Sequence, residues 1–336
     1  MSTTETKSEH PAARSLIERH RIKIWESLPW ILALAYYFAF PRHLGFGTEL
    51  LITVLFAISL DLALGYAGIV TLGHAAFFGA GAYTVGMLAF HNVLNEPITG
   101  LFIAAAVAGT VGFLSGIVLL RTTGLTLLML TLCTMALLEE GANVGAEYTG
   151  GFDGLPGMII KPLFGTFEFN PLIPRVQYLY VLGVLFICFV LVRTLVYSPF
   201  GQSLTGIREN TLRMHAVGAP VNWRLVICYT ISAALAGVAG ALWTQSNAYV
   251  NLSTLSLDRA ATVLIILVLG GYGRLYGSFL GAVAYMFLAH WLSKIYPTAW
   301  QLGLGLLLIL IALFARNGIL GLFDTILRVT KIRRPS

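Results

Sequence analysis

The chain has 336 residues, of which 57% are hydrophobic and only 11% are charged, with a mean hydropathy of +0.81. A typical soluble domain is about 45–50% apolar and about 25% charged, so this chain has too few polar side chains to cover a water-soluble body of its size. These values exclude an intrinsically disordered chain and argue against a soluble enzyme. Because the apolar residues are concentrated in long stretches, the sequence predicts an all-α polytopic membrane protein.

The net charge of +6 does not indicate nucleic-acid binding, because the positions of the basic residues follow membrane topology. Cys133, Cys188 and Cys228 lie inside apolar stretches and have no CxxC spacing. The absence of this spacing argues against a zinc site or a disulfide framework. We expect each cysteine to be a small buried apolar side chain. No metal site and no cofactor on this chain are expected.

Residues 1–27 are polar and lack the short apolar region and cleavage site of a secretory signal, so we expect a retained cytoplasmic tail. A transmembrane domain is expected over residues 28–315, and a basic cytoplasmic tail over residues 316–336. A straight helix needs about 20 residues to cross the ~30 Å hydrocarbon core, so the short eighth and tenth segments are expected to be half-helices or partly sheltered by protein. The ten predicted apolar segments are 28–46, 49–68, 71–91, 98–120, 123–144, 176–196, 225–247, 258–271, 277–293 and 300–315.

The positions of the basic residues test this number of helices. If the N-terminus is cytoplasmic and each segment changes side, sixteen of the 21 lysines and arginines lie inside, as the positive-inside rule requires. Adding or removing a segment in the middle of the chain would remove this excess of basic residues on the inner side. We therefore expect about ten transmembrane helices with both termini in the cytoplasm. The basic residues left outside are Arg42, Lys161, Arg175, Arg259 and Lys294.

Two connections between the segments are longer than a turn. The external one, residues 145–175, contains the run Tyr148-Thr149-Gly150-Gly151-Phe152-Asp153-Gly154-Leu155-Pro156-Gly157. Its density of glycine and proline predicts an irregular, shaped loop rather than a helix.

The cytoplasmic connection, residues 197–224, predicts a short amphipathic helix that ends at Gly218-Ala219-Pro220. Such a helix either lies on the lipid headgroups or docks onto a cytoplasmic partner, and the pattern alone leaves both open. The residues that recur at helical spacing on its apolar face are Leu204, Ile207, Thr211, Met214 and Val217.

Small residues four positions apart predict close helix packing, because they let helix backbones approach each other in lipid. The pairs with this spacing are Gly112 and Gly116, Gly237 and Ala241, and Gly277 and Gly281.

The chain has no GxxxxGK[ST] motif, so it contains no recognisable site for ATP hydrolysis. Gly271-Tyr272-Gly273 is not followed by a third glycine at the spacing of a dinucleotide-binding turn. HExxH and GxSxG are also absent, and no residue at a suggestive spacing supplies a nucleophile for an intramembrane enzyme that uses His74.

Charged residues inside membrane segments are few, and each costs roughly 2.5–3.5 kcal/mol at a helix centre on insertion scales. Asp61 is expected either to form a structural hydrogen bond to a neighbouring helix or to line a transport pathway. Glu139 and Glu140, near the outer end of their segment, either extend to the outer interface or belong to the pathway. His74 follows the break at Gly65-Tyr66-Ala67-Gly68 and opens the third segment, where a helix N-terminus offers N–H groups to a substrate carboxylate.

Four blocks of sequence, in order, resemble the LivM-type permease subunit of branched-chain amino acid ABC importers. The resemblance covers about residues 50–322. The blocks are Leu64–Tyr83, Thr149-Gly150-Gly151 with Asp153-Gly154-Leu155, Gly206–Asn210 running to Gly218 and then Ile231–Gly240, and Leu269-Gly270-Gly271-Tyr272-Gly273 through Gly277 and Gly281.

This resemblance implies a multi-pass protein of the bacterial inner membrane that pairs with a second, homologous permease. It also implies two cytoplasmic ATPases, which bind the ATP and Mg²⁺, and an external substrate-binding protein. The cytoplasmic loop is similar to the segment that couples the permease to the ATPase, with Gly201, Arg208, Glu209, Asn210 and Gly218 as the expected coupling residues. The expected substrate pathway includes Asp61, Gly68, His74, Glu139 and Glu140, and the loop expected to face the binding protein includes Gly150, Gly151, Asp153 and Gly154.

The chain departs from the family pattern at a few positions. Asp61 stands where the family more often has asparagine, and Ser278 where proline is common. Related permeases carry urea, short amides or aromatic acids, so these substrates are alternatives to branched-chain amino acids. An ion-coupled carrier that uses Asp61 with Glu139 and Glu140 as a relay is the alternative from another class.

Overall fold

The computed structural model describes residues 27–158, 174–295, 297, 302–303 and 305–306. Within them the chain is helical apart from short connections and one two-stranded pairing. The elements are α2 (Leu28–Ala39), α3 (Leu44–Leu60), a π-helical turn (Asp61–Tyr66), α4 (Ala75–Phe90), α5 (Pro97–Leu119), α6 (Leu125–Val144), α7 (Ala146–Thr149), β1 (Leu155–Pro156), α8 (Arg175–Tyr197), α9 (Pro199–Glu209), α10 (Thr211–Ala216), α11 (Val221–Asn247), β2 (Tyr249–Val250), a 3-10 turn (Leu252–Thr254), α12 (Leu257–Gly270) and α13 (Gly277–Ile295).

The helical architecture and its apolar segments confirm a polytopic membrane protein. Seven helices in the described part of the chain are long and apolar enough to cross a membrane. Two further apolar helices are shorter: α2 with 12 residues and α4 with 16. At 1.5 Å per residue α2 extends about 18 Å, less than the ~30 Å hydrocarbon core. Most of the predicted tenth segment, 300–315, lies outside the described residues, so the total of ten stays a prediction.

The boundary between the first two predicted segments was wrong. The segment predicted to end at residue 46 stops at Ala39, and α3 already starts at Leu44. Pro41 explains the shift, because proline disfavours helical backbone in the preceding residue and lacks the N–H that continues a helix. Gly47 lies inside α3, where a Cβ would press against the rings of Tyr36 and Tyr178.

The cytoplasmic loop was predicted as one amphipathic helix, and it forms two. Asn210 has extended backbone (φ −157°, ψ 97°) between α9 and α10, and its side-chain oxygen accepts a hydrogen bond of 2.9 Å from the Arg213 N–H. Asparagine favours this N-cap role because its side chain replaces the missing helical acceptor. Gly218, with φ +83°, follows the end of α10 as predicted.

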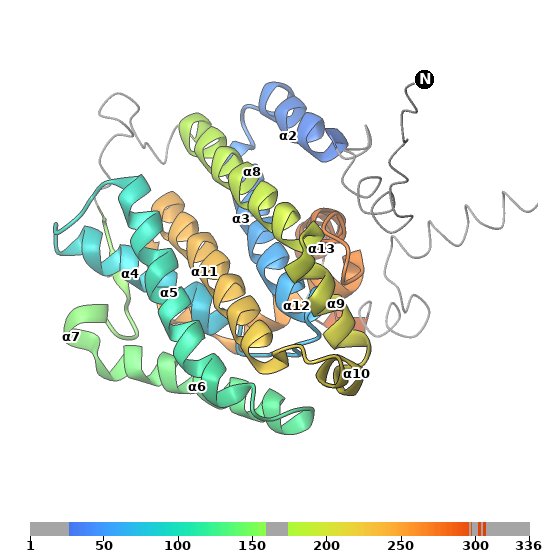
Figure 1. The fold of residues 1–336 in the computed structure, drawn as a ribbon. Helices are drawn as coiled ribbons and strands as arrows, with labels where there is room; N and C mark the ends of the chain where they lie inside the picture. The colour runs from blue at the N-terminus through green and yellow to red at the C-terminus, as the bar shows by residue number, and fades with distance from the viewer. Residues whose placement is uncertain (1–26, 159–173, 296, 298–301, 304, 307–336) are drawn as a thin grey trace, which may run out of the picture.

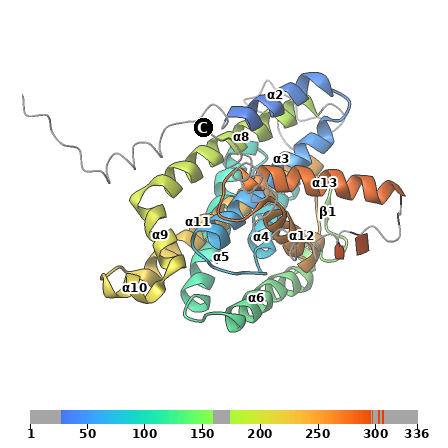
Figure 2. The ribbon, with the colours of Figure 1, turned by 90° about the vertical axis from the view of Figure 1, so that its right-hand side faces the viewer.

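Helix α11 is the centre of the bundle and packs most extensively against α5 and α4 (Figure 1). Two of the three predicted small-residue pairs lie in these contacts: a Cβ at Gly112 would overlap Ala233, and one at Gly237 would overlap Ala108. The third pair, Gly277 and Gly281, lies where α13 packs on α12. Helices α2 and α8 border one side of α11 and α3, whereas α6 borders the opposite side (Figures 1 and 2). Tight packing of small residues therefore builds the core.

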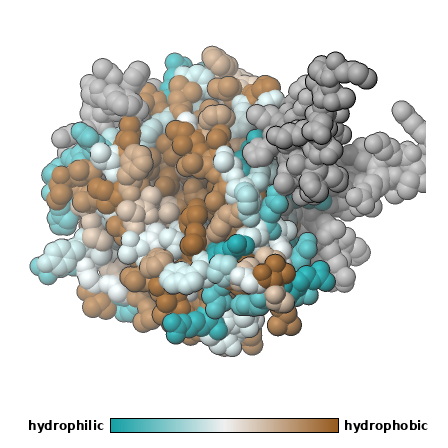
Figure 3. All heavy atoms as spheres, in the orientation of Figure 1, coloured by the Kyte–Doolittle hydropathy of each residue, from teal (hydrophilic) through white to brown (hydrophobic). Residues whose placement is uncertain are grey.

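The position of α6 at the edge of the bundle corrects one prediction. Cys188 and Cys228 are buried as expected, but Cys133, on α6, is exposed. Apolar side chains cover much of the surface (Figure 3). Hydrophilic residues gather at the lower right of that view, where Figure 1 places α9 and α10.

The crossing of α4 and α11 gives a stability prediction. A Cβ at Gly240 would overlap the Phe78 carbonyl oxygen, so Gly240→Ala is expected to destabilise the protein by about 1–3 kcal/mol through overpacking. The matched control is Gly183→Ala in α8, where a Cβ meets nothing within 4 Å. Thermal unfolding of the detergent-solubilised variants tests this, and equal melting temperatures for both would contradict it.

Candidate functional site

The π-helical turn after α3 places one predicted site residue against a loop far away in sequence. π-helical turns are rare and frequently occur at functional sites. Asp61 is the first residue of the turn and is fully buried, and its Oδ1 accepts a 2.7 Å hydrogen bond from the Gly273 N–H. The hydrogen bond expected of Asp61 is therefore present, and its partner is the turn between α12 and α13.

Arg208 joins α9 to the same place. Its Nη1 donates a hydrogen bond to the Gly65 carbonyl, and its guanidinium lies 5.2 Å from the centre of the Tyr272 ring. Gly68, with φ +74°, faces the Arg208 stem, because a Cβ there would lie 3.0 Å from the Arg208 Cγ. We call Asp61, Gly65, Gly68, Arg208, Tyr272 and Gly273 the junction.

Glycine is required at the centre of the junction. A Cβ at Gly65 would overlap both Asp61 Oδ1 and the Gly273 nitrogen. Gly273 itself has φ +78°, a backbone conformation that favours glycine. The two backbones can therefore approach closely enough for Asp61 to bridge them.

The charges of the junction are only partly balanced. Asp61 and Arg208 attract each other electrostatically but form no direct ion pair. The second carboxylate oxygen of Asp61, Oδ2, is buried and has no hydrogen-bond partner among the described residues. A buried acceptor without a partner costs free energy, so the junction holds a group that can gain an interaction when the structure changes.

The predicted coupling residues occupy distinct positions in the cytoplasmic segment. Gly201 is buried against the backbone of α8, where a Cβ would overlap the Val196 carbonyl oxygen. Glu209 is exposed, and Asn210 and Gly218 start and end α10. We call α9 and α10 together the coupling segment.

The apolar side chains of the coupling segment divide between two surfaces. Leu204 and Ile207 are buried against the bundle, whereas Leu212 and Val217 are 82% and 76% exposed. Exposed large apolar side chains close together are typical of a surface that another protein or lipid covers.

His74 lies in a packed region rather than at an open helix end. Its ring stacks on Phe56 at 5.6 Å, and its Nε2 is 2.9 Å from the Ser59 hydroxyl. Because Ser59 donates its own proton to the Phe56 carbonyl, we assign the Nε2 proton to the imidazole as the donor. The Ser232 hydroxyl donates to the Ser59 carbonyl at 2.5 Å, so the histidine belongs to a polar contact between α3, α4 and α11.

Helix α4 does begin immediately after His74, as expected. However, the N–H groups of Ala76 and Phe77 already donate to the carbonyls of Gly73 and His74. These hydrogen bonds occupy donors of the first turn that a substrate carboxylate would need.

Glu139 and Glu140 are not brought to Asp61. They lie on α6, which packs mainly against α4 and α5, whereas the π-helical turn packs against α3, α9 and α11. Glu139 is half-buried and interacts electrostatically with Tyr83, and Glu140 is exposed. The predicted pathway residues thus fall into three separate places.

The predicted external loop begins with the short helix α7, which the prediction of an irregular loop missed, and it is irregular from Gly150 to Met158 apart from β1. Gly150, Gly151 and Gly154 have positive φ, and β1 pairs with β2 at the end of α11. The Thr149 hydroxyl donates to the Ala142 carbonyl, and Tyr249 donates to the Asp153 carbonyl at 3.2 Å. The remainder, 159–173, lies outside the described residues.

Sequence reasoning missed the contact between Gly65 and Gly273. The run Gly271-Tyr272-Gly273 fails to match a nucleotide-binding motif, and nothing in it names Asp61 as a partner. Two features of the sequence could have suggested this contact: the glycines of this run between two apolar segments, and an aspartate, Asp61, inside another apolar segment. Among the described residues no group of three histidine, cysteine, aspartate or glutamate side chains is placed to hold a metal ion.

The Asp61 hydrogen bond generates a test of the junction. Asp61→Asn keeps an oxygen acceptor for Gly273, whereas Asp61→Leu leaves the Gly273 N–H unpaired, at a cost of about 1–3 kcal/mol. We expect amide exchange in residues 269–275 to be about tenfold or more faster in Asp61→Leu than in Asp61→Asn. Hydrogen–deuterium exchange mass spectrometry measures this, with residues 233–241 of α11 as the internal control. Equal exchange in the two variants would contradict the assigned bond.

Comparison with curated proteins finds permeases over most of the chain. The chain is 28% identical over 316 residues to the high-affinity branched-chain amino acid transport system permease protein LivM of Escherichia coli K12, covering 86% of this chain and 73% of that protein. It is 25% identical over 268 residues to a probable LivM of Methanocaldococcus jannaschii, covering 68% and 75%. It is also 30% identical over 257 residues to the autoinducer 2 import system permease protein LsrC of an Enterobacter species, covering 72% and 70%.

No solved structure matches the chain significantly. The family model for the permease component of branched-chain amino acid transport systems matches residues 44–313. That range contains the junction, the coupling segment and every predicted site residue, and it covers most of the chain. The chain therefore belongs to the permease-component family of branched-chain amino acid transport systems, and it is a transport subunit rather than an enzyme.

Proposed function

We propose that this chain is the transmembrane subunit of an ATP-driven importer for branched-chain or related amino acids. The observation that supports this best is the junction, in which Arg208 of the coupling segment donates a hydrogen bond to Gly65 beside the buried Asp61. A cytoplasmic surface segment is thereby joined to backbone inside the helix bundle. ATP and Mg²⁺ are bound by partner chains, and this chain needs no cofactor.

The coupling segment transmits the ATPase movement through Arg208. The outer side of α10, with Leu212 and Val217 exposed, is the surface that docks onto an ATPase. When the ATPase moves α9, Arg208 displaces the π-helical turn, and Asp61 passes the displacement to Gly273. Both α3 and the turn between α12 and α13 then move together.

The external loop receives the substrate-binding protein. Gly150, Gly151 and Gly154 fix a turn-rich backbone that leaves Tyr148 and Phe152 63% and 85% exposed. Exposed aromatic side chains on a rigid loop are favourable contacts for a protein partner. Asp153, whose carbonyl is held by Tyr249, adds an acidic group to this surface.

The proposed topology has ten transmembrane helices, with the 1–27 and 316–336 tails in the cytoplasm of a bacterium and the chain in its inner membrane. Helices α2 and α4 are shorter than the about 20 residues that a straight crossing needs, so neighbouring protein shelters their ends. A second, homologous permease beside this chain, and two ATPases below the pair, complete the assembly.

The names of the relatives indicate two classes of substrate. The LivM proteins are named for branched-chain amino acids, and LsrC is named for autoinducer 2. Urea, short amides and aromatic acids are further alternatives. We favour amino acids because the LivM relatives, from a bacterium and an archaeon, are both named for them.

The first experiment is to tag the chain, extract it gently from native membranes and identify the co-purifying proteins by mass. A second polytopic permease with P-loop ATPases is the expected result. Recovery of the chain alone in several mild detergents, together with ion-driven uptake in vesicles, would instead establish the ion-coupled carrier. In that case the unpartnered oxygen of Asp61 becomes the first candidate for the ion site.

Arg208 allows a direct test of coupling. In the reconstituted importer Arg208→Ala is expected to reduce ATP-driven uptake about tenfold or more, because the charge-assisted hydrogen bond to Gly65 is worth about 1.5–3 kcal/mol. ATP hydrolysis is expected to continue. Arg121→Ala is the matched control, since Arg121 follows the end of α5 and its side chain donates to the Ile117 carbonyl of that helix rather than to the junction.

A second variant tests the docking side of the segment. Glu209→Lys reverses an exposed charge on α9 and is expected to impair uptake in an expressed and assembled complex. Unchanged uptake in both Arg208→Ala and Glu209→Lys would show that α9 and α10 are not the coupling segment.

A further inference from the structure

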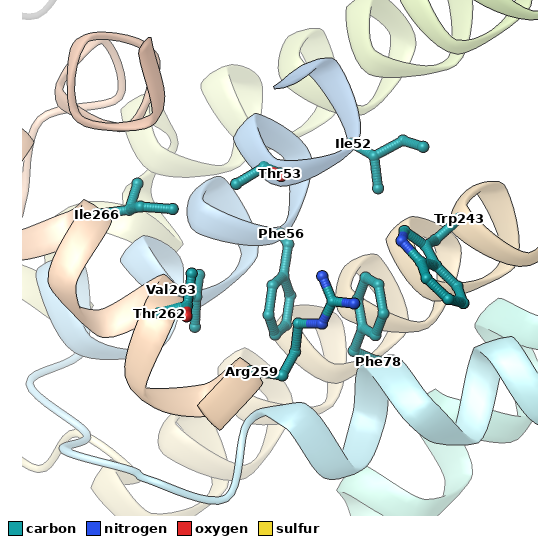
Figure 4. Close-up of a pocket in the computed structure, with 9 residues that line it drawn as sticks. All are labelled: Ile52, Thr53, Phe56, Phe78, Trp243, Arg259, Thr262, Val263 and Ile266. Atoms are coloured by element: carbon teal, nitrogen blue, oxygen red, sulfur yellow. The ribbon is translucent and has the colours of Figure 1, made fainter. Parts of the chain in front are cut away.

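A pocket lies between helices α3, α4, α11 and α12, on the side of the bundle away from the coupling segment. Figure 4 shows Arg259 reaching from α12 toward side chains of α3, α4 and α11. Its cavity volume is about 20 Å³, room for about one water molecule, so the pocket must widen to hold a larger ligand. It is lined by Ile52, Thr53, Phe56, Phe78, Trp243, Arg259, Thr262, Val263 and Ile266.

The Arg259 guanidinium is held by aromatic rings rather than by hydrogen-bond acceptors. Its central carbon lies 5.3 Å from the centre of the Phe78 ring and 5.2 Å from that of Trp243. These cation–π contacts fix the orientation of the group, but its five N–H donors make no hydrogen bond to any described residue. A half-buried arginine in this state is prepared for an anionic partner.

The position of Arg259 within α12 adds to this argument. It lies in the first turn of the helix, after the N-cap Ser256, where the helix dipole is positive and favours anions over cations. The helix dipole therefore does not stabilise the charge of Arg259 itself. A bound carboxylate would be stabilised by the guanidinium and the helix end together.

The remaining walls match the rest of an aliphatic amino acid. Ile52, Val263 and Ile266 are buried apolar side chains, and Phe56 and Phe78 provide aromatic surface. Glu49, one turn before Thr53 on α3, interacts electrostatically with Arg259. The pocket thus combines one cation, one nearby anion and an apolar wall.

We propose that this pocket binds the transported amino acid, with Arg259 holding its carboxylate, Glu49 facing its ammonium group and the apolar wall contacting its aliphatic side chain. This inference rests on the proposed function. In the proposed topology Arg259 lies toward the outside of the membrane. The pocket is therefore the first site in the permease that the substrate reaches after the binding protein releases it.

The same helix connects this pocket to the junction. Helix α12 has Arg259 in its first turn and is followed by Gly271-Tyr272-Gly273, which Asp61 and Arg208 hold. A movement of the coupling segment therefore shifts α3 and α12 together relative to α4 and α11. That shift opens or closes the pocket between them.

Substrate protection of a cysteine tests the pocket without relying on transport. Thr262→Cys is placed in a Cys133→Ser background, because Cys133 is the exposed native thiol among the three. The assembled importer is labelled with a small methanethiosulfonate reagent, with and without millimolar leucine. We expect leucine to slow labelling several-fold, and Arg259→Gln to abolish this protection while labelling without leucine persists.

The matched control is Arg175→Gln, since Arg175 is an exposed arginine at the outer end of α8 outside the pocket. It is expected to leave leucine protection intact. Equal protection in Arg259→Gln and Arg175→Gln, or no labelling of Thr262→Cys at all, would overturn the proposal.

ATP-driven leucine uptake by the same preparations separates this inference from the proposed function. Arg259→Gln is expected to lower uptake about ten- to hundredfold, the loss expected for a charge-assisted hydrogen bond. Arg259→Lys is expected to lower uptake less, because lysine keeps the charge but loses the planar pair of donors. If the unmodified importer transports leucine and Arg259→Gln transports it equally well, the pocket assignment fails alone. If the unmodified importer transports no amino acid, the proposed function fails.

Discussion

Every backbone polar group inside a membrane must find a partner within the protein, because lipid offers none. The end of α3 is where this constraint is most severe. The π-helical turn and the turn at Gly273 both leave the regular helical hydrogen-bond pattern, and two charged side chains complete them: Asp61 accepts from the Gly273 N–H, and Arg208 donates to the Gly65 carbonyl. The presence of an aspartate and an arginine here therefore follows from irregular backbone as much as from function.

Small residues make this arrangement possible. Helices α4, α5 and α11 approach so closely that added methyl groups at Gly81, Gly112 or Gly237 would overlap a neighbouring helix. In lipid such contacts replace the hydrophobic driving force of a soluble core. The result is a tightly packed centre around α11, whereas α12 packs mainly against α13 and α3 and is followed by the glycine-containing turn at Gly271 and Gly273.

Hydropathy and charge predicted much of this architecture. Long apolar segments locate a helix with few competing interpretations, and small residues four apart correctly marked helix contacts. The break at Asn210 was missed because the apolar positions on either side keep a continuous helical spacing, so the pattern does not reveal that an N-cap interrupts it. The end of α2 was misplaced because apolar residues continue beyond Pro41.

The candidate site was predictable only in its parts. Asp61, Gly68 and Arg208 were each singled out, but from different arguments, and nothing in the sequence indicated that they meet. Arg208 and Gly65 are 143 residues apart, and their contact depends on the packing of α9 against the π-helical turn and α11. His74 shows the opposite outcome: its place at a helix start was correct, but the packing of Phe56 and Ser59 around it was not visible in the sequence.

The Asn210 break has a consequence for how such a protein can evolve. Leu204, Ile207 and Arg208 hold α9 to the bundle, while α10 has its own N-cap and exposes Leu212. The exposed side of α10 is therefore separate from the surface that packs on the bundle. Substitutions on α10 can adapt the chain to a new ATPase without disturbing the membrane domain, and substitutions in the bundle can change the cargo without altering the ATPase. One type of ATPase can in this way drive permeases that transport different substrates.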